Sequence, residues 1–421
     1  MQIAQERRAL AIVLVTLLID TIGFGIVMPV MPRLITGLTH GSLSDAARTG
    51  GWLMFAFAGM QFLFGPVMGG LGDRFGRRPV ILASLTAFGL DYIVMGLAPS
   101  IGWLFASRAF AGMAGASFVP ATAYIADITP PERRAQNFGL VGAAFGTGFV
   151  VGPALGGLLG GLGVRAPFFA AAALALVNAA MGFFFLPESL PADRRRAFSP
   201  ARANPFGTFR SLARRPATLP LFSAWFLWML AHQSYPAIWA FFTKYRFGWG
   251  EGMIGASLAY VGLLMALAQA FITRRLIPII GERRAILLGL SLGLAGFAGN
   301  AFATRGWMVF PILAISALQG LVFPSMNSTM SRLVASNEQG ELQGGVASLQ
   351  SVAAITGPPL LTNAFAYFTR ADSGFTFPGA AFALASLFTI GAMVIVAFFA
   401  RGAFAHVAPR AGAAATGPAG H

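Results

Sequence analysis

The chain has 421 residues, of which 56% are hydrophobic and only 10% charged, and its formal net charge is +15. This composition excludes an ordinary soluble domain, because apolar runs close to the roughly 20 residues needed to cross a bilayer recur along the chain. The absence of cysteine excludes disulfides and cysteine-ligated metal sites. We therefore interpret the sequence as an all-α, multi-pass membrane protein.

Apolar stretches follow one another along the chain and predict twelve transmembrane helices, so both termini lie on the same side of the membrane. The predicted spans are residues 9 to 33, 50 to 71, 79 to 98, 101 to 122, 136 to 161, 165 to 186, 218 to 243, 252 to 276, 284 to 303, 307 to 331, 340 to 367 and 378 to 401. The first lacks a small-residue cleavage site, so we expect it to be retained. The composition of residues 402–421 predicts a disordered tail.

Basic residues are divided unevenly between the two sides of the predicted bundle. Of the 29 Lys and Arg residues, 21 fall on the side of the termini and 7 on the other, with Arg108 inside a span. The positive-inside rule therefore predicts that both termini are cytoplasmic. Because the basic residues are spread over many loops, they favour contact with an anionic lipid bilayer over binding of nucleic acid.

An internal repeat divides the chain. A shift of 205 residues aligns Gly-Arg-Arg at 76–78 with Gly-Glu-Arg at 281–283, and Gly-Pro at 152–153 with Gly-Pro at 357–358. The copies are six spans apart, which gives them the same orientation and relates them by an axis along the membrane normal. We predict an N-terminal six-helix bundle over 1–186, a basic cytoplasmic linker over 187–217, a C-terminal six-helix bundle over 218–401, and the tail over 402–421.

Three ionisable residues interrupt the apolar spans of the first half, namely Asp20, Asp91 and Arg108. A charge at membrane depth costs about 2.5 to 3.5 kcal/mol on insertion scales, so such residues mark binding, pairing or proton relay. At about 1.5 Å per helical residue, all three can share a level near the midplane. One reading is a structural ion pair, but two carboxylates facing one guanidinium leave one acid over. We predict a proton-coupling site in which Arg108 repels or displaces the proton.

Neutral polar side chains at membrane depth in the C-terminal half predict part of the wall of a substrate cavity. They are His232, Gln233, Gln319, Asn327 and Gln350. The four histidines lack metal-ligand spacing, so we expect no metal site, and His232 is interpreted as a cavity or packing group. The one lysine, Lys244, follows no phosphate-binding motif, which argues against coupling to ATP. No convergent nucleophile, base or metal set can be named, so we expect neither an enzyme nor a cofactor.

The loop between the second and third predicted spans reads GGLGDRFGRRP over residues 69–79. In this loop Gly76 permits a tight turn and Pro79 suits the first turn of the next helix. The run resembles the signature G-x-x-x-D-R-x-G-R-[RK] of the major facilitator superfamily, matched at Gly69, Asp73, Arg74, Gly76, Arg77 and Arg78. The resemblance implies a cytoplasmic gate, for which Asp127 and Arg134, beyond the fourth span, are similar to the family's partner residues.

A glycine-rich motif lies in the fifth predicted span. The pattern G-x-x-x-G-P-x-x-G-G is matched at Gly148, Gly152, Pro153, Gly156 and Gly157. Glycines four residues apart allow close helix packing in any membrane bundle, which is one reading. The pattern also resembles the antiporter motif of drug and proton exporters, which implies exchange rather than symport. The run R-x-x-A-G-x-x-G that begins at Arg108 is similar to the fourth-span motif of the same exporters.

From end to end the chain resembles the tetracycline and proton antiporters, through stretches such as LLIDTIGFGIVMPVMP, LDYIVMGLAP and RFGWGEGMIGASLAYVGLLMALAQAF. Positions that this family uses are occupied by Asp20, Gln61, Asp73, Asp91 and Arg108, which adds Gln61 to the predicted cavity. Two positions depart from the family, because Gly293 stands where an acid is usual and Met265 where some members have histidine.

We therefore predict a proton-coupled efflux antiporter that exports a lipophilic, drug-like small molecule by alternating access, with tetracycline as one candidate cargo. Its partners would be the small-molecule substrate, protons and the lipid bilayer, and we expect a monomer in the bacterial inner membrane. A proton-coupled importer or facilitator of a small metabolite remains as the alternative.

Overall fold

The computed structural model describes residues 2–114, 118–130, 133–198, 218–334, 338–400 and 404, so the predicted tail and most of the linker lie outside it. Throughout the described ranges the regular elements are helices, and no strand occurs. The first half contains α1 (Gln2–Val27), α2 (Met31–Thr39), α3 (Leu43–Phe75), α4 (Arg77–Leu97), α5 (Ile101–Ala114), α6 (Phe118–Ile128), α7 (Arg134–Gly160) and α8 (Ala166–Phe185). The second contains α10 (Leu219–His232), α11 (Ser234–Phe247), α12 (Glu251–Leu267), α13 (Arg274–Ile280), α14 (Glu282–Phe302), α15 (Val309–Ala317), α16 (Val322–Arg332), α17 (Gln339–Thr369) and α18 (Ala380–Val394).

Short irregular turns join several of these helices into longer rods. Three are 3₁₀ turns, η1 (Met28–Val30), η5 (Gly306–Met308) and η6 (Leu318–Leu321), and two are π-helical, η4 (Ala268–Thr273) and η8 (Ile395–Phe399). A further 3₁₀ turn, η3 (Ala192–Arg194), lies in the linker after α8. The fold is therefore the all-α class that the sequence predicts.

Nine helical stretches in the described part of the chain are long and apolar enough to cross a membrane. The three other predicted spans are also helical but fall short for separate reasons. In the span 101–122, residues 115–117 between α5 and α6 lie outside the described residues, and the span 218–243 consists of two 14-residue helices that meet at Gln233. The third, α17, has 31 residues but carries polar side chains and two prolines. The count of twelve spans stays a prediction.

The internal repeat is visible in the helix boundaries. α4 and α14 both have 21 residues, and their first residues, Arg77 and Glu282, have the 205-residue offset seen in the sequence. α7 and α17 begin with the same offset. Gly76 precedes α4 with φ 106° and Gly281 precedes α14 with φ 78°, conformations that glycine adopts most readily. The two copies of this loop therefore share their backbone as well as their sequence pattern.

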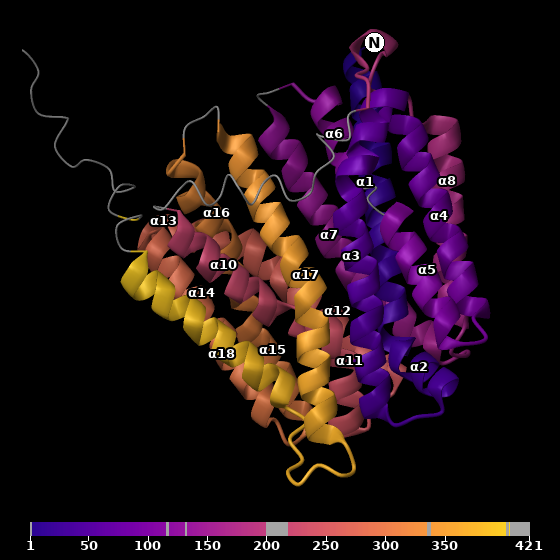
Figure 1. The fold of residues 1–421 in the computed structure, drawn as a ribbon. Coiled ribbons are helices and arrows are strands. Elements are labelled where there is room, and N and C mark those ends of the chain that lie inside the picture. The colour runs from indigo at the N-terminus through magenta and orange to yellow at the C-terminus, as the bar shows by residue number, and fades with distance from the viewer. Residues whose placement is uncertain are drawn as a thin grey trace, which may run out of the picture.

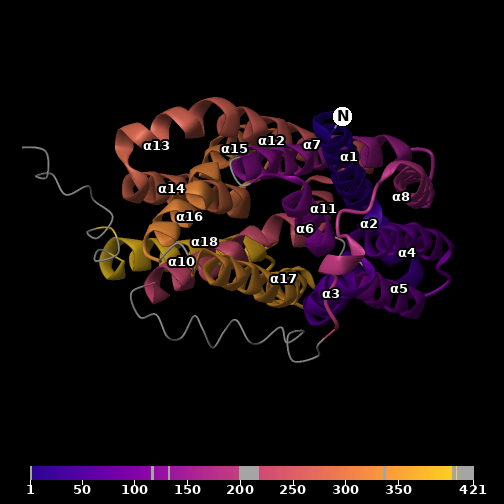
Figure 2. The same ribbon diagram turned by 90° about the horizontal axis from the view of Figure 1, so that it is seen from above.

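The two halves form helical bundles that lie side by side, with the N-terminus at the top of the view (Figure 1). Seen from above, α7 runs beside α12, and α3 runs beside α17 (Figure 2). Glycines permit these close crossings: a Cβ on Gly157 would lie 2.8 Å from the carbonyl oxygen of Glu251, and one on Gly51 would overlap the Thr362 hydroxyl. Small residues let helix backbones approach in this way.

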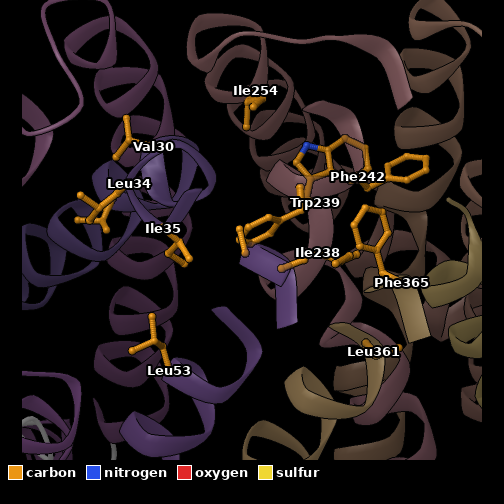
Figure 3. Close-up of a cluster of buried hydrophobic side chains, with 14 of the residues drawn as sticks. Val30, Leu34, Ile35, Leu53, Ile238, Trp239, Phe242, Ile254, Leu361 and Phe365 are labelled. Atoms are coloured by element: carbon orange, nitrogen blue, oxygen red, sulfur yellow. The ribbon is translucent and has the colours of Figure 1, made fainter. Parts of the chain in front are cut away.

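Apolar side chains from both halves form one buried cluster (Figure 3), and α2 and α11, which contribute to it, lie near the lower end of the molecule in Figure 1. The first half supplies Val30, Leu34, Ile35 and Leu53, and the second supplies Ile238, Trp239, Phe242, Ile254, Leu361 and Phe365, all of them buried. At this closed end the hydroxyls of Ser44 and Thr369 lie 2.7 Å apart.

Toward the opposite end the halves separate. α3 runs from Leu43 at the closed end to Phe75 at the opposite, open end, where the Gly76 loop follows. Among the described residues, no atom lies within 4 Å of a Cβ added at Gly139 or Gly142 of α7 or at Gly340 of α17. The halves therefore pack closely at one end of their interface, and we call the other end, where these positions have no close described neighbour, the open end.

Candidate functional site

Two of the three charged residues at membrane depth form a buried ion pair. Asp91 of α4 and Arg108 of α5 contact each other through Oδ2 and Nη2, and their side chains are 0% and 12% exposed. Ser107 donates its hydroxyl to Oδ1 of Asp91. On the other side, the Arg108 guanidinium lies 5.4 Å from the centre of the Phe57 ring. The pair thus ties α4, α5 and α3 together by charge, hydrogen bonding and cation–π contact.

The third charged residue, Asp20 of α1, lies apart from this pair. Its Oδ1 is 3.5 Å from Nδ2 of Asn178 in α8, which also donates to the carbonyl oxygen of Thr16 at 3.2 Å. Within the described residues, no Lys or Arg forms an ion pair with Asp20. Tyr92 adjoins the same region, because its hydroxyl lies 3.3 Å from the position of a Cβ on Gly23. Among the described residues, Asp91 is therefore paired with a cation, whereas Asp20 has only neutral groups beside it.

The glycines of the α7 motif lie where helices touch. A Cβ on Gly148 would lie 2.5 Å from Cβ of Thr21, directly after Asp20, and one on Gly156 would overlap the carbonyl oxygen of Ile26. Gly152 meets the backbone of the same helix, α1, whereas Gly157 faces α12 of the other half. The motif residues thus place α7 between the helix that carries Asp20 and the second half of the chain.

The signature loop is organised by Arg77 at the start of α4. Its Nη2 lies 2.7 Å from Asp73 Oδ1 and its Nε 3.3 Å from Asp127 Oδ2. Its Nη1 is also 3.5 Å from the carbonyl oxygen of Gly69, and Ser189 donates its hydroxyl to Asp127 at 3.2 Å. The structure therefore brings together four residues of the predicted gate from α3, α4 and α6.

Three other predicted gate residues, Arg74, Arg78 and Arg134, do not join this cluster in the part of the chain that the structure describes. Arg78 donates to the carbonyl oxygen of Phe183 in α8 at 2.6 Å. Arg74 lies over the ring of Phe75 at 5.0 Å, away from the ion pairs. The side chain of Arg134 lies outside the described residues.

Glu188, which the sequence reasoning missed, accepts hydrogen bonds from the backbone at the start of α4. Its carboxylate accepts the backbone N–H of Arg77 at 2.8 Å and that of Arg78 at 3.3 Å. An acid at this place satisfies free N–H groups and complements the helix dipole. A Cβ on Gly76 would overlap Glu188, so this glycine is required by space as well as by its positive φ.

The chain matches a known protein family and several characterised relatives in sequence. A family model described as Major Facilitator Superfamily matches residues 13–358. The chain belongs to the major facilitator superfamily. It is 44% identical over 86% of its length to the tetracycline resistance protein, class C, of Escherichia coli, and covers 91% of that protein. Against the class G protein of Vibrio anguillarum it is 39% identical over 84% of its length, and covers 89% of that relative.

Solved transporter structures share the fold of this superfamily member. The human organic anion transporter MFSD10 (TETRAN) superposes with a TM-score of 0.69 at 24% identity, covering 93% of this chain and 99% of that one. The nucleoside transporter NupG superposes with a TM-score of 0.73 at 12% identity, covering 94% and 100% of the two chains. At these identities the likeness describes the fold alone.

The predicted cavity residues of this transporter are distributed over several places. His232 and Gln233 lie at the break between α10 and α11, where Gln233 packs against Gly357 of α17. Asn327 accepts a hydrogen bond from Gln343 of α17 at 2.9 Å. Gln61 lies half-buried in α3 and Gln350 half-buried in α17. The structure does not bring all six predicted residues into one contact cluster.

Gln319 of η6 lies inside the second half and occupies space beside Gly293. Its Oε1 would be 3.1 Å from a Cβ on Gly293, the position where the sequence resemblance leads us to expect an acid. The hydroxyl of Tyr235 faces Gln319, Asn300 and Ser316, with the Ser316 hydroxyl at 3.3 Å. Sequence reasoning did not find Tyr235 or Asn300. A neutral polar group thus stands beside the position of the missing acid.

Proposed function

We propose that this transporter exports a lipophilic, drug-like small molecule in exchange for protons, with tetracycline as the first cargo to test. The relatives support this, because the class C tetracycline resistance protein is 44% identical over most of both chains. The fold supports alternating access, in which two related halves rock about a central site. We also propose a monomer in the bacterial inner membrane with both termini cytoplasmic, so that the open end faces the cytoplasm.

The observation that carries the proposal is the pairing of Arg108 with Asp91, which leaves Asp20 without a cation among the described residues. A buried ion pair keeps both charges, because neither is stable alone. Asp20 has the Asn178 amide at 3.5 Å, a neutral partner that compensates its charge weakly. An acid in that state is suited to exchange a proton during each cycle. Asp20 is accordingly the proposed proton carrier, and the Asp91–Arg108 pair its fixed electrostatic neighbour.

Helix packing connects the segment that carries Asp20, through α7, to the interface between the halves. The residues that follow it on α1 touch the α7 glycines, with Thr21 at Gly148 and Gly25 at Gly152. α7 in turn contacts α12 of the second half along the Gly157 face. Gaining or losing a charge at Asp20 therefore acts one helix away from the crossing about which the halves would rock.

The break between α10 and α11 offers aromatic surfaces for a planar cargo. The His232 ring lies 5.3 Å from that of Trp228 and 5.8 Å from that of Tyr235. Nδ1 of His232 is buried and has no hydrogen-bond partner in the described residues. Aromatic faces with a few free polar atoms suit a lipophilic ring system that bears hydroxyl or carbonyl groups.

The test measures tetracycline flux in proteoliposomes with and without an imposed pH gradient. One proton moved at 100 mV supplies about 2.3 kcal/mol, enough for a roughly fiftyfold cargo gradient. Asp20→Asn should abolish concentration of cargo by the proton gradient while leaving cargo exchange down its own gradient. Asp193→Asn, an exposed acid in the linker, is the matched control and should behave as the parent.

Two outcomes would contradict the proposal. Concentrative export by the Asp20→Asn variant would remove Asp20 from proton coupling. Cargo uptake that follows the proton gradient inward, without export, would identify the importer or facilitator instead.

A further inference from the structure

The first turns of α4 and α14, which are equivalent in the repeat, are anchored in the same way. Arg78 Nη2 donates to the carbonyl oxygen of Phe183 in α8 at 2.6 Å, and Arg283 Nη2 donates to that of Ala397 in η8 at 3.0 Å. Both acceptors lie 17 residues after the first residue of their own helical rod, α8 or α18. The arginines are 205 positions apart, as the repeat requires. The loop therefore repeats its side-chain contacts along with its backbone.

The neighbouring contact is repeated with its charges reversed. In the first half Arg77 lies 3.3 Å from Asp127, and in the second Glu282 lies 2.6 Å from Arg332. Arg77 and Glu282 are equivalent in the repeat, and so are Asp127 and Arg332. Each pair joins the start of one helix, α4 or α14, to the end of another, α6 or α16. The ends of α6 and α16 thus carry opposite charges at equivalent positions.

Two-fold related halves bring equivalent surfaces toward each other when they close about their axis. Like charges at equivalent positions would repel there, whereas Asp127 and Arg332 would attract. Seen from above, α6 and α16 lie toward the middle of the molecule, while α4, α5 and α8 lie on the outer side of the first half (Figure 2). The two side chains are also accessible, at 27% and 52% exposed.

We propose that Asp127 and Arg332 exchange partners during transport. While the open end is open, each pairs within its own half, as in this structure. When that end closes, Asp127 and Arg332 pair with each other and latch α6 to α16. The inference rests on the alternating access proposed above, because it requires a state in which the open end is closed.

The exchange leaves neither former partner alone. Arg77 keeps Asp73, whose carboxylate is 2.7 Å away. Glu282 keeps the Ser328 hydroxyl at 3.5 Å and stands in the first turn of α14, where the helix dipole favours an acid. Each released residue therefore has a second partner, so neither becomes an unpaired charge.

Variants with reversed charges at these positions distinguish the proposed latch from the ion pairs within each half. The double variant Asp127→Arg/Arg332→Asp puts like charges into both within-half pairs but restores attraction across the halves. The double variant Glu282→Arg/Arg332→Asp does the opposite, because it restores the pair within the second half and places two acids across the interface. Single Asp127→Asn and Arg332→Gln variants remove each charge with little change of size.

The readout is the distance between spin labels on Gly142→Cys and Ala347→Cys, equivalent exposed positions on α7 and α17. The chain has no cysteine, so these are its only thiols. In proteoliposomes across a range of pH, the parent should show a long and a short distance, for the open and closed states. Each neutral variant removes one pair from each state, so its ratio of short to long distances is the baseline for the double variants, which should shift that ratio in opposite directions about two- to fivefold for each partly exposed ion pair changed.

The two double variants decide between the models. The latch predicts that Asp127→Arg/Arg332→Asp raises the share of the short distance above that of the neutral variants and that Glu282→Arg/Arg332→Asp lowers it. The reverse order, or a parent without any short distance, would overturn the latch. The measurement needs no cargo, so a failure to export tetracycline would leave it unaffected and would count against the proposed function alone.

Discussion

Neutralising either Asp91 or Arg108 alone should lower the free energy of unfolding strongly, whereas neutralising both should restore most of it. The two side chains are 0% and 12% exposed, so neither charge has water to replace a lost partner. Arg108→Gln leaves a buried carboxylate with the Ser107 hydroxyl, and Asp91→Asn leaves a buried guanidinium against the Phe57 ring. Breaking such a pair from one side costs about 3 to 5 kcal/mol. The double variant buries no charge, so we expect it to recover most of that loss.

The assay is the free energy of unfolding of the purified protein in mixed micelles of mild detergent and SDS, followed by tryptophan fluorescence. If the two residues did not depend on each other, the double variant would lose the sum of both costs, about 6 to 10 kcal/mol. A double variant as unstable as that sum would refute the reasoning. The recovered double variant should also retain proton-coupled export, because Asp20 is unchanged.

The other predictions use the same preparations. Gly156→Ala should lower the free energy of unfolding by about 1 to 3 kcal/mol through overpacking against α1, whereas Gly142→Ala, with no neighbour within 4 Å, should leave it unchanged or raise it. Gly76→Ala should cost about 1 to 3 kcal/mol, because its φ of 106° and ψ of 157° are adopted almost only by glycine and the added Cβ would overlap Glu188, and a parent-like stability would contradict this. Asn178→Ala should slow export severalfold because it removes the amide beside Asp20. Tetracycline binding, measured by fluorescence quenching, should be unchanged. Equal losses of binding and export would contradict that last expectation.

The helices were predictable from the sequence, but the choice of partner for Asp91 and Arg108 was not. A rise of about 1.5 Å per residue places Asp20, Asp91 and Arg108 at similar levels. It does not give the rotation of each helix about its axis, and rotation decides which side chains meet. The structure turns Asp91 toward α5 and Asp20 toward α8. The sequence left the ion pair open as one reading, and only tertiary packing selects between the acids.

Residues distant in sequence were harder to find than those within a motif. Glu188 lies 111 positions from Arg77, and nothing in its own surroundings marks it as the acceptor for the start of α4. Asn178 gave a usable signal, because it is the one side chain with hydrogen-bonding groups in the apolar run from Ala166 to Phe185. The rule that marks isolated charges at membrane depth applies to isolated amides as well.

Packing explains why the second half has no equivalent of the charged site. Gly296 stands at the position equivalent to Asp91, and a Cβ there would overlap the hydroxyl of Ser316. Leu313 replaces Arg108 and Trp225 replaces Asp20, and both are fully buried. A carboxylate at Gly296 would therefore lack both room and a cation, at a cost of several kcal/mol. The repeat can share its helices and its loop between the halves, but among the described residues a buried ion pair of this kind fits only in the first.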